Sequence, residues 1–442
     1  MASRETPRAT AASGFDDLDS ADEALLEVRD LETAFYTEEG KVKAVDGISY
    51  TIGRGERFAV VGESGAGKSV TSLSLMRLIE SPGRIESGDI RFHSEVAVAK
   101  LAREFSDGIA TNDRDGFIHV EEISGAGAGA GGDPGATVRD RPSAVATDFH
   151  DGDIEVERGY VDLLRAPEGA MREIRGGEIA MIFQDPHTAL NPVYTVGEQI
   201  AEAVRAHMDL DDEGVRERVI EMLDKVGIPD PEERYSDYPH QFSGGMQQRA
   251  VIAIALSCDP DLIIADEPTT ALDVTIEAQI LELLKELSEE FDVAIQLITH
   301  DLGVVAELCE RVMVMYAGRA VEKADVESLY YEPKHPYTVG LMGSIPRIGD
   351  IRERLDTIPG TMPDLVQLPP GCSFHPRCPY AEEACTKRDP ALVNTDTGEL
   401  ADEDDPSVHA AACLEYTGEL QEGLDFEIEI ADDTDALIGG DE

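Results

Sequence analysis

The stretch that most constrains this chain runs from Arg57 to Leu78 and reads RFAVVGESGAGKSVTSLSLMRL. Its apolar start predicts a strand that stops at Gly62, and the pattern G-x-x-x-x-G-K-S predicts a phosphate-binding loop followed by a helix. Such a loop needs glycines because side chains would keep backbone N–H groups from closing around phosphates. Lys68 offers the phosphates a positive charge, Ser69 offers Mg²⁺ a hydroxyl, and the helix N-terminus adds its dipole. The loop residues are Gly62, Ser64, Gly65, Ala66 and Gly67.

Elsewhere, short apolar runs alternate with amphipathic stretches of helical period. The apolar runs lie at 58–61, 177–183, 262–265, 293–298 and 312–316. The helical patterns cover 195–208, 215–226 and 275–291. An antiparallel hairpin is favoured over 24–53, before the loop. Strands that alternate with helices indicate an α/β domain with a mostly parallel sheet, in which ligand groups gather at the C-terminal ends of the strands.

Polar groups follow several of these apolar runs directly. Gln184 comes after the second run. Asp266 and Glu267 follow the third, and His300 lies just beyond the fourth. Two adjacent carboxylates at a strand end are costly unless a cation, or a function in water, keeps them charged. The pair Gly244 and Gly245 opens a helix and predicts a second anion site through the helix dipole.

The charge of the chain is strongly negative. Its 442 residues include 37 Lys and Arg against 91 Asp and Glu, a net charge of −54 at pH 7. Such a chain repels nucleic acid, and we expect no nucleic-acid partner. We expect a halophilic source, because molar salt shortens the Debye length to about 3 Å and screens the self-repulsion. A specific cationic partner is the alternative explanation.

The two ends and one internal stretch lack the patterns of packed elements. Residues 1–23 and 416–442 are acidic and polar, and we expect disordered tails there. The stretch at about 94–165 contains GAGAGAGGDPGATVRDRPS and predicts a surface insertion that is flexible in part. No apolar run approaches the ~18 residues of a membrane span, and the N-terminus has no signal-peptide core. We therefore expect a soluble or peripheral, intracellular protein.

Six motifs occur in an order that resembles a known family. They are the phosphate loop, the strand-end glutamine, S-G-G-M-Q, L-I-I-A-D-E-P, A-L-D and the strand-end histidine. Over about 24–345 they resemble the nucleotide-binding subunit of an ABC transporter. M-I-F-Q-D-P, F-S-G-G-M-Q-Q-R and E-P-K-H-P-Y-T resemble the ATP-binding subunits of dipeptide and oligopeptide importers. The resemblance implies a P-loop ABC ATPase domain with a mostly parallel sheet, an antiparallel β subdomain and a helical subdomain, and a small cysteine-containing extension at 346–415.

The resemblance also implies ATP hydrolysis with Mg²⁺ and gives each strand-end group a role. Gln184 would sense the γ-phosphate and the metal. Asp266 would fix Mg²⁺, mostly through water. Glu267 would act as general base on the attacking water, which His300 would steady.

A second ATP-binding subunit is implied by the same family. Ser243–Gly245 would act on the ATP held by the opposite subunit, and Asp273 would lie at the seam between the two. Residues 186–199 would receive a coupling helix from a membrane permease. Phe35 aligns best with the aromatic ring that stacks on adenine, with Tyr36 as the near alternative. From the residues alone, sheet packing explains either ring equally well.

The family further implies two membrane permease subunits and an external substrate-binding protein that acts through them. We expect an ATPase at the cytoplasmic face of the membrane that powers import of peptides or related small solutes. The alternative is a soluble ABC ATPase acting on ribosomes or nucleic acid. A single nucleotide domain and the lack of a basic patch argue against that alternative.

Four of the six cysteines lie late in the chain, in the pattern C-x5-C-x6-C-x27-C. Four thiols in one short extension of an intracellular protein predict a shared metal. Zinc sites favour closer pairs, so the wide spacing favours a [4Fe-4S] cluster, with zinc or free thiols as alternatives. Some members of the peptide-importer family hold such a cluster in a similar extension. The predicted ligands are Cys372, Cys378, Cys385 and Cys413.

Overall fold

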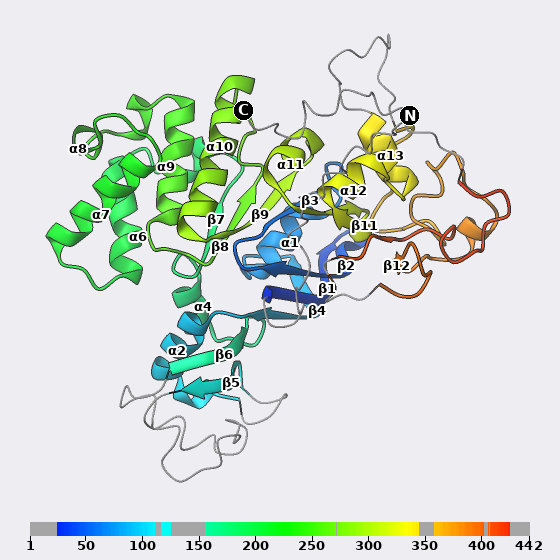
Figure 1. Ribbon diagram of the computed structural model, residues 1–442, viewed down its shortest axis with the longest axis horizontal. Helices are drawn as coiled ribbons and strands as arrows, with labels where there is room; N and C mark the ends of the chain where they lie inside the picture. Colours follow the sequence, from blue (N-terminus) through cyan, green and yellow to red (C-terminus); the bar gives the residue numbers. More distant parts are fainter. Residues whose placement is uncertain are drawn as a thin grey trace, which may run out of the picture.

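The computed structural model describes residues 24–110, 116–124, 155–270, 272–343, 358–401, 405 and 407–424. The predicted tail at 1–23, most of the acidic tail and the glycine-rich run at 125–154 lie outside these residues. The described chain forms two sheets with helices around them (Figure 1). The predicted α/β class is confirmed.

The larger sheet contains eight strands among the described residues. Five adjacent strands of this sheet are parallel to one another, and the other three strands, at one end of the sheet, pair in antiparallel fashion. The order is β7 (Ile179–Ile182), β8 (Leu262–Asp266), β9 (Ala294–Thr299), β3 (Arg57–Val61), β10 (Arg311–Tyr316), β11 (Arg319–Asp325), β13 (Ala410–Ala411) and β12 (Val393–Asn394). β8 and β9 are buried along their whole length, which explains why they read as unbroken apolar runs.

The smaller sheet contains five antiparallel strands of the described chain. Their order is β2 (Gly40–Gly53), β1 (Ala24–Thr37), β4 (Gly83–Phe92), β6 (Glu155–Asp162) and β5 (Ile118–Ser124). Together with α1 (Lys68–Leu75), α2 (Glu95–Glu104) and α4 (Glu168–Ile174), this sheet packs on one face of the larger sheet. Alternate residues of the central strands serve the two faces, since Val60 belongs to this core and Ala59 to the opposite one.

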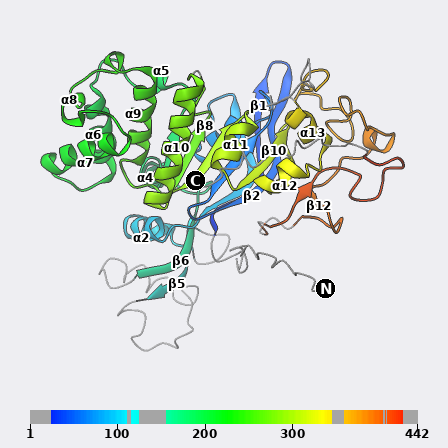
Figure 2. The ribbon, with the colours of Figure 1, turned by 45° about the horizontal axis from the view of Figure 1, so that its top comes forward.

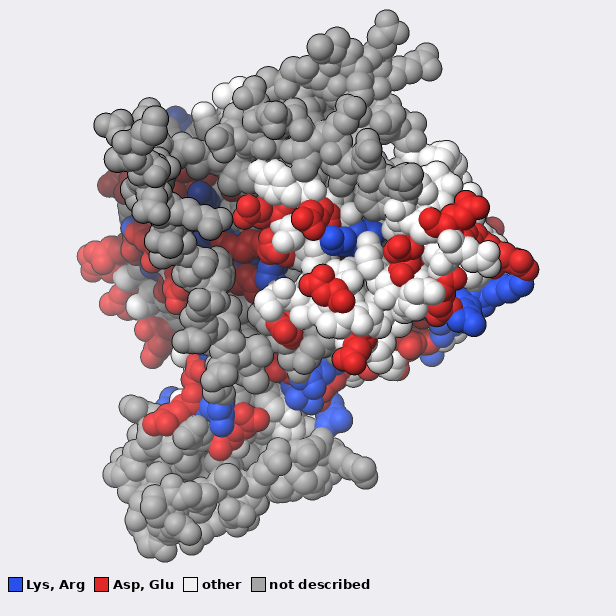
Figure 3. Space-filling model, turned by 45° about the vertical axis from the view of Figure 1, so that its right-hand side comes forward, with Lys and Arg blue, Asp and Glu red and all other residues white. Residues whose placement is uncertain are grey.

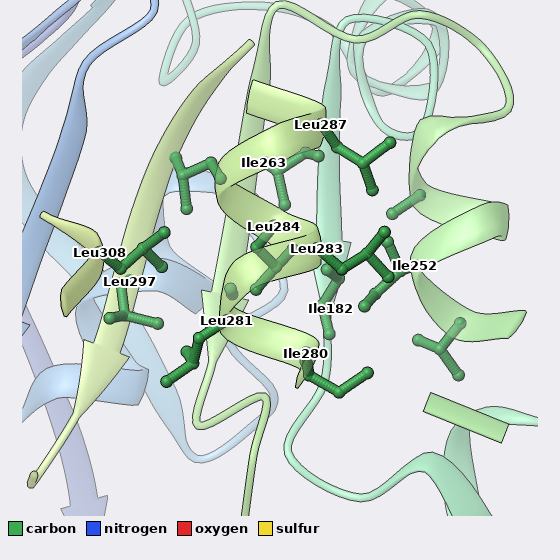
Figure 4. Packing of buried hydrophobic residues seen from close by; sticks show 14 of the residues in the cluster. Ile182, Ile252, Ile263, Ile280, Leu281, Leu283, Leu284, Leu287, Leu297 and Leu308 are labelled. Carbon is green, nitrogen blue, oxygen red and sulfur yellow. The ribbon is translucent and has the colours of Figure 1, made fainter. Parts of the chain in front are cut away.

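Helices cover the other face of the larger sheet. Figure 4 shows leucines of one of these helices, among them Leu283 and Leu287, packed between Ile263 of β8 and Ile252 of a neighbouring helix. The helices of this side are α5 (Pro186–Ala189), α6 (Val196–His207), α7 (Asp212–Lys225), α8 (Pro231–Arg234), α9 (Gly244–Leu256), α10 (Val274–Phe291), α11 (Leu302–Leu308), α12 (Val326–Tyr331) and α13 (Pro336–Gly343). Of these, α6 to α9 form the predicted helical part, on the opposite side of the molecule from α13 and β12 (Figure 1).

The stretch predicted as an insertion contributes ordered elements where it is described. The helix α2 follows β4, and β5 pairs with β6 to widen the smaller sheet. In Figures 1 and 2 these elements project from the rest of the molecule. The glycine-rich run that prompted the prediction is outside the described residues, so partial flexibility stays a prediction.

The described residues from 358 onward, called the C-terminal region below, join the larger sheet at its edge. β13 pairs with β11, with Ala411 opposite Glu322, and Phe374 is buried in the core between the helices and that edge. On the face shown in Figure 3, acidic side chains are spread among uncharged ones. No helix of the described chain is long and apolar enough to cross a membrane.

Candidate active site

The predicted phosphate loop connects β3 to α1. Gly62, Gly65 and Gly67 all have positive φ, at 154°, 84° and 105°. A Cβ at Gly62 would lie 2.3 Å from the carbonyl oxygen of Met315, and one at Gly67 would lie 2.1 Å from that of Ala44. Glycine is therefore required at both ends of the loop, because any side chain would collide with backbone.

Replacing Gly67 by Ala tests this requirement. We expect the variant to lose about 2–4 kcal/mol of unfolding free energy, since it combines left-handed strain with a backbone collision. Thermal or urea unfolding measures the loss. Gly47→Ala is the matched control, because Gly47 has φ of 76° and open space around its Cβ position. Equal losses in the two variants would contradict the collision at Gly67.

Lys68, the first residue of α1, is buried beneath the loop with 6% of its surface exposed. Its Nζ donates hydrogen bonds to the carbonyl oxygens of Gly62 at 2.8 Å and Glu63 at 3.1 Å. Burial lowers the pKa of Lys68, and the carboxylates of Glu267 and Asp266 act against that shift. The ammonium group is thus fixed inside the loop, in reach of any phosphate that the loop binds.

Ser69 and Asp266 meet as predicted. The Ser69 hydroxyl donates to Asp266 Oδ1 over 3.1 Å, although the two residues are far apart in sequence. Burial raises the pKa of Asp266, and the bond from Ser69 opposes that rise. A hydroxyl and a carboxylate oxygen are hard oxygen ligands of the kind Mg²⁺ takes. This donor set fits the predicted magnesium ion.

Glu267 lies at the centre of a second group of polar side chains. Gln184 Nε2 donates to Glu267 Oε2 at 2.7 Å, and His300 Nδ1 lies 3.1 Å from Glu267 Oε1. The Thr270 hydroxyl donates to the same carboxylate at 3.0 Å, a contact that was not predicted. Its signal was present in the sequence, since a hydroxyl three residues along a turn can reach back.

The environment of Glu267 keeps its carboxylate charged. Burial acts to raise its pKa, but the hydrogen bonds of His300 and Thr270 and the nearby charges of His300 and Lys68 outweigh burial, so the pKa is lowered. Its backbone has φ of 47°, an uncommon conformation for a residue other than glycine. An ionised carboxylate held at the end of a parallel strand can accept a proton from water.

Ser243–Gly245 and Asp273 start two helices that contact each other. Ser243 caps α9, and its hydroxyl accepts the Met246 N–H. Asp273 caps α10 and accepts two backbone N–H groups at 3.1 Å each. A Cβ at Gly245 would lie 2.8 Å from Ile276 of α10. Of the two helices, α9 belongs to the helical part of the fold, whereas α10 packs on the larger sheet (Figure 1).

The two candidate adenine-stacking rings are neighbours on β1. Phe35 pairs with Val42 and Gly83 and is half-buried. Tyr36 is 46% exposed, and its hydroxyl donates to Glu86. The choice of Phe35 for adenine therefore stays a prediction.

The predicted iron–sulfur site is corrected by the structure. The four late cysteines line one pocket, yet no group of three or more His, Cys, Asp or Glu side chains that could hold a metal occurs in the described ranges. Burial raises the pKa of Cys378 to about 11 and that of Cys413 to about 12. Cys372 and Cys378 pack against the apolar core. The spacing of the cysteines in the sequence predicted their proximity but not the packing of Cys372 and Cys378 against the apolar core.

Two protein families match the sequence. Residues 45–122 and 147–270 match the family described as ABC transporter. Residues 321–385 match the family described as oligopeptide/dipeptide transporter, C-terminal region.

Individual proteins match over most of the chain. The dipeptide transport ATP-binding protein DppD of Bacillus subtilis is 44% identical over 83% of this chain and 90% of its own length. The oligopeptide transport ATP-binding protein AppD of the same species is 43% identical over 85% and 94%. Among solved structures, a dimeric ATP-binding cassette bound to ADP and phosphate is 21% identical, with a TM-score of 0.47, over 68% of this chain and 98% of its own.

The expectation of a halophilic source is also corrected. Similar proteins come from Brucella ovis, Bacillus subtilis and Escherichia coli, and none of these names indicates a salt-adapted source. The net charge alone was too weak a basis, because charge constrains solubility and binding rather than origin.

The site and the comparisons agree. The phosphate loop, the pair Ser69 and Asp266, and the group around Glu267 are those of an ATP-hydrolysing enzyme. Identities of 44% and 43% hold over 83% and 85% of the chain. The chain therefore belongs to the ATP-binding subunits of ABC transporters, in the family of peptide and dipeptide importers.

Proposed function

We propose that this chain hydrolyses ATP to drive import of dipeptides or oligopeptides through a separate membrane permease. The observation that supports it best is identity of 44% to a dipeptide transport ATP-binding protein over 366 residues, together with the matched C-terminal region of oligopeptide and dipeptide transporters. The ATP site supplies the energy, and the identity of the solute lies with partners outside this chain.

Different residues of the chain have different roles in ATP hydrolysis. The backbone N–H groups of the loop and the ammonium of Lys68 bind the phosphates. Bound Mg²⁺, held by Ser69 and Asp266, would neutralise charge that develops on the phosphate oxygens. Glu267 accepts the proton of the attacking water, and Gln184 and His300 orient that carboxylate through hydrogen bonds.

The site is completed by a second ATP-binding subunit in this proposal. Ser243, Gly244 and Gly245 begin a helix of 13 residues whose first turn has no acidic side chain. Such a helix start attracts phosphate. We propose that it contacts ATP held by the opposite subunit, with Asp273 at the seam and Phe35 under the adenine. ATP then holds the two subunits together, and hydrolysis releases them.

A groove beside α5 and α6 suits the permease. Its volume is about 630 Å³, and it combines apolar side chains with the ion pair of Glu198 and Arg205 and the carboxylate of Glu202. Val193 and Tyr194 at its rim are 70% and 54% exposed. A short permease helix with apolar side chains and a basic residue would bury the Tyr194 ring and the Val193 side chain and would pair with the Glu202 carboxylate. This contact would place the chain at the cytoplasmic face of the membrane.

Capture of the tagged chain from gently solubilised membranes tests the proposal. We expect two integral membrane permease subunits and a second ATP-binding subunit, identified by mass. Tyr194→Asp should reduce permease recovery at least about tenfold while ATPase activity of the free chain is kept, because the variant loses the ring that the permease helix would bury and places a charge against the apolar side chains of that helix. Val96→Asp on α2, at an equally exposed valine, is the control. Recovery of ribosomal proteins or nucleic acid without permease would contradict the proposal.

A further inference from the structure

One residue of the C-terminal region contacts the phosphate loop directly. The guanidinium of Arg377 donates two hydrogen bonds to the carboxylate of Glu63, from Nη1 to Oε2 at 2.9 Å and from Nη2 to Oε1 at 3.0 Å. Glu63 is the loop residue after Gly62. Two parallel bonds between a guanidinium and a carboxylate fix both orientation and distance.

Arg377 is held rigidly for this contact. Its side chain is 6% exposed, and its Nε donates to the carbonyl oxygen of Pro359 at 2.8 Å. The guanidinium lies 5.7 Å from the ring centre of Tyr316 and 6.0 Å from that of Phe374. Every nitrogen of the guanidinium is therefore engaged, and a preorganised group of this kind loses little entropy when it holds a partner.

The backbone of Glu63 shapes the part of the loop that binds phosphate. Its N–H donates to the hydroxyl of Tyr337 at 2.9 Å. Its carbonyl oxygen accepts from Lys68 Nζ at 3.1 Å and from the N–H of Ala66 at 3.1 Å. A shift of Glu63 would therefore move the lysine and the amides that meet the phosphates.

The contact between Arg377 and Glu63 also neutralises a negative charge on the phosphate loop. The Glu63 side chain is 28% exposed and belongs to the loop, so its negative charge acts on any phosphate bound there. Paired with Arg377, that charge is neutralised. Without Arg377, an uncompensated carboxylate would repel the anionic ligand at close range, where the effective dielectric constant is low.

We infer that Arg377 is a positioning residue of the ATP site, through which the C-terminal region sets the ATP affinity of the phosphate loop. Arg377 acts through Glu63: it holds the loop backbone in its binding conformation and cancels the carboxylate charge beside the phosphates. The inference rests on the ATPase activity of the chain alone. It would stand even if the transported solute were not a peptide, and its test uses the isolated full-length chain.

Four variants of the full chain separate this role from a merely structural one. We expect Arg377→Met to raise the ATP dissociation constant, measured with a fluorescent ATP analogue, by about tenfold or more. The KM for ATP should rise in parallel, while kcat at saturating ATP changes by less than about threefold. Arg377→Lys, which keeps the charge but not the two parallel bonds, should fall between Arg377→Met and the unaltered chain.

Removal of the Glu63 charge gives the decisive result. In the double variant Glu63→Gln/Arg377→Met, no uncompensated carboxylate remains, and we expect ATP affinity to rise at least about threefold above that of Arg377→Met, while the lost hold on the loop keeps it below that of the unaltered chain. Glu63→Gln alone should bind ATP at least as tightly as the unaltered chain, because the negative charge beside the phosphates is removed while Arg377 stays in place and the amide oxygen can still accept from it. If the contact only braced the fold, every one of these variants would bind ATP more weakly than the unaltered chain, and the double variant would bind it no better than Arg377→Met.

Arg388→Met is the matched control. Arg388 lies in the same region, pairs with Glu419 and is 64% exposed, so its loss should leave ATP affinity unchanged. Thermal unfolding of each variant reports on folding. If Arg377→Met lowers the unfolding temperature but leaves ATP affinity unaltered, or if Glu63→Gln fails to raise affinity in the double variant, the inference is overturned. If Arg377→Met does not fold, Arg377→Lys and Glu63→Gln alone still decide between the two roles.

Discussion

Glu267→Gln is expected to slow ATP hydrolysis at least about 100-fold while ATP binding is retained. Glutamine has the size and shape of glutamate, so its side-chain oxygen still accepts from Gln184 or Thr270, and the loop that binds phosphates is untouched. What is lost is the charge, which the contacts of His300 and Lys68 maintain in the folded protein. An uncharged amide cannot take the proton from water.

Trapping of a dimer is the second part of this result. If ATP joins two subunits and hydrolysis separates them, a chain that binds ATP without cleaving it should accumulate as a dimer. Phosphate release measures hydrolysis, and light scattering during gel filtration measures the mass with and without ATP. Glu178→Gln is a suitable control, because this buried carboxylate, whose pKa burial raises, lies beside Lys100 and outside the site. Brisk turnover of Glu267→Gln would show that another group is the base.

The chemistry at the strand ends was predictable from the sequence for a geometric reason. Parallel strands end at a common edge, so groups that follow β7, β8 and β9 had to meet. Gln184, Glu267 and His300 do meet there, within hydrogen-bond distance. The loop glycines were predictable as well, because few other sequences allow backbone to approach phosphates.

Other features depend on contacts that sequence patterns do not contain. Glu63 and Arg377 are 314 residues apart, and neither lies in a periodic pattern that points to the other. β5 and β6 were missed because a long glycine-rich run separates them, which hides the pairing of one strand with the next. For the late cysteines, the sequence pattern predicted a site that the structure does not show. Their spacing predicted a metal site, whereas Cys372 and Cys378 pack against apolar side chains.

The burial of Lys68 has a consequence for substitution. Its ammonium group supplies the hydrogen bonds that two loop carbonyls accept, from Gly62 and Glu63, and it is nearly inaccessible to solvent. Alanine would leave the Gly62 carbonyl without this donor, at a cost of about 1–3 kcal/mol where water cannot replace it, whereas the Glu63 carbonyl would keep the N–H of Ala66. Replacing Lys68 would therefore change ATP binding in two ways: it would alter the structure of the loop, and it would remove the positive charge opposite the phosphates.

Lys68→Ala is expected to weaken ATP binding at least about 100-fold, equivalent to about 2.7 kcal/mol, and to abolish hydrolysis at millimolar ATP. Titration with a fluorescent ATP analogue measures the affinity. Lys323→Ala is the matched control, since Lys323 is similarly buried, at 8% exposure, and donates to the carbonyl oxygen of Ser49 on the smaller sheet. Both variants should have a lower free energy of unfolding, but only Lys68→Ala should have a lower affinity for ATP. Undiminished ATP affinity in Lys68→Ala would mean that the loop between β3 and α1 does not bind phosphate. Equal loss in both variants would mean that the effect arises from general destabilisation, because a buried lysine far from the phosphates would then matter as much as the one beneath them.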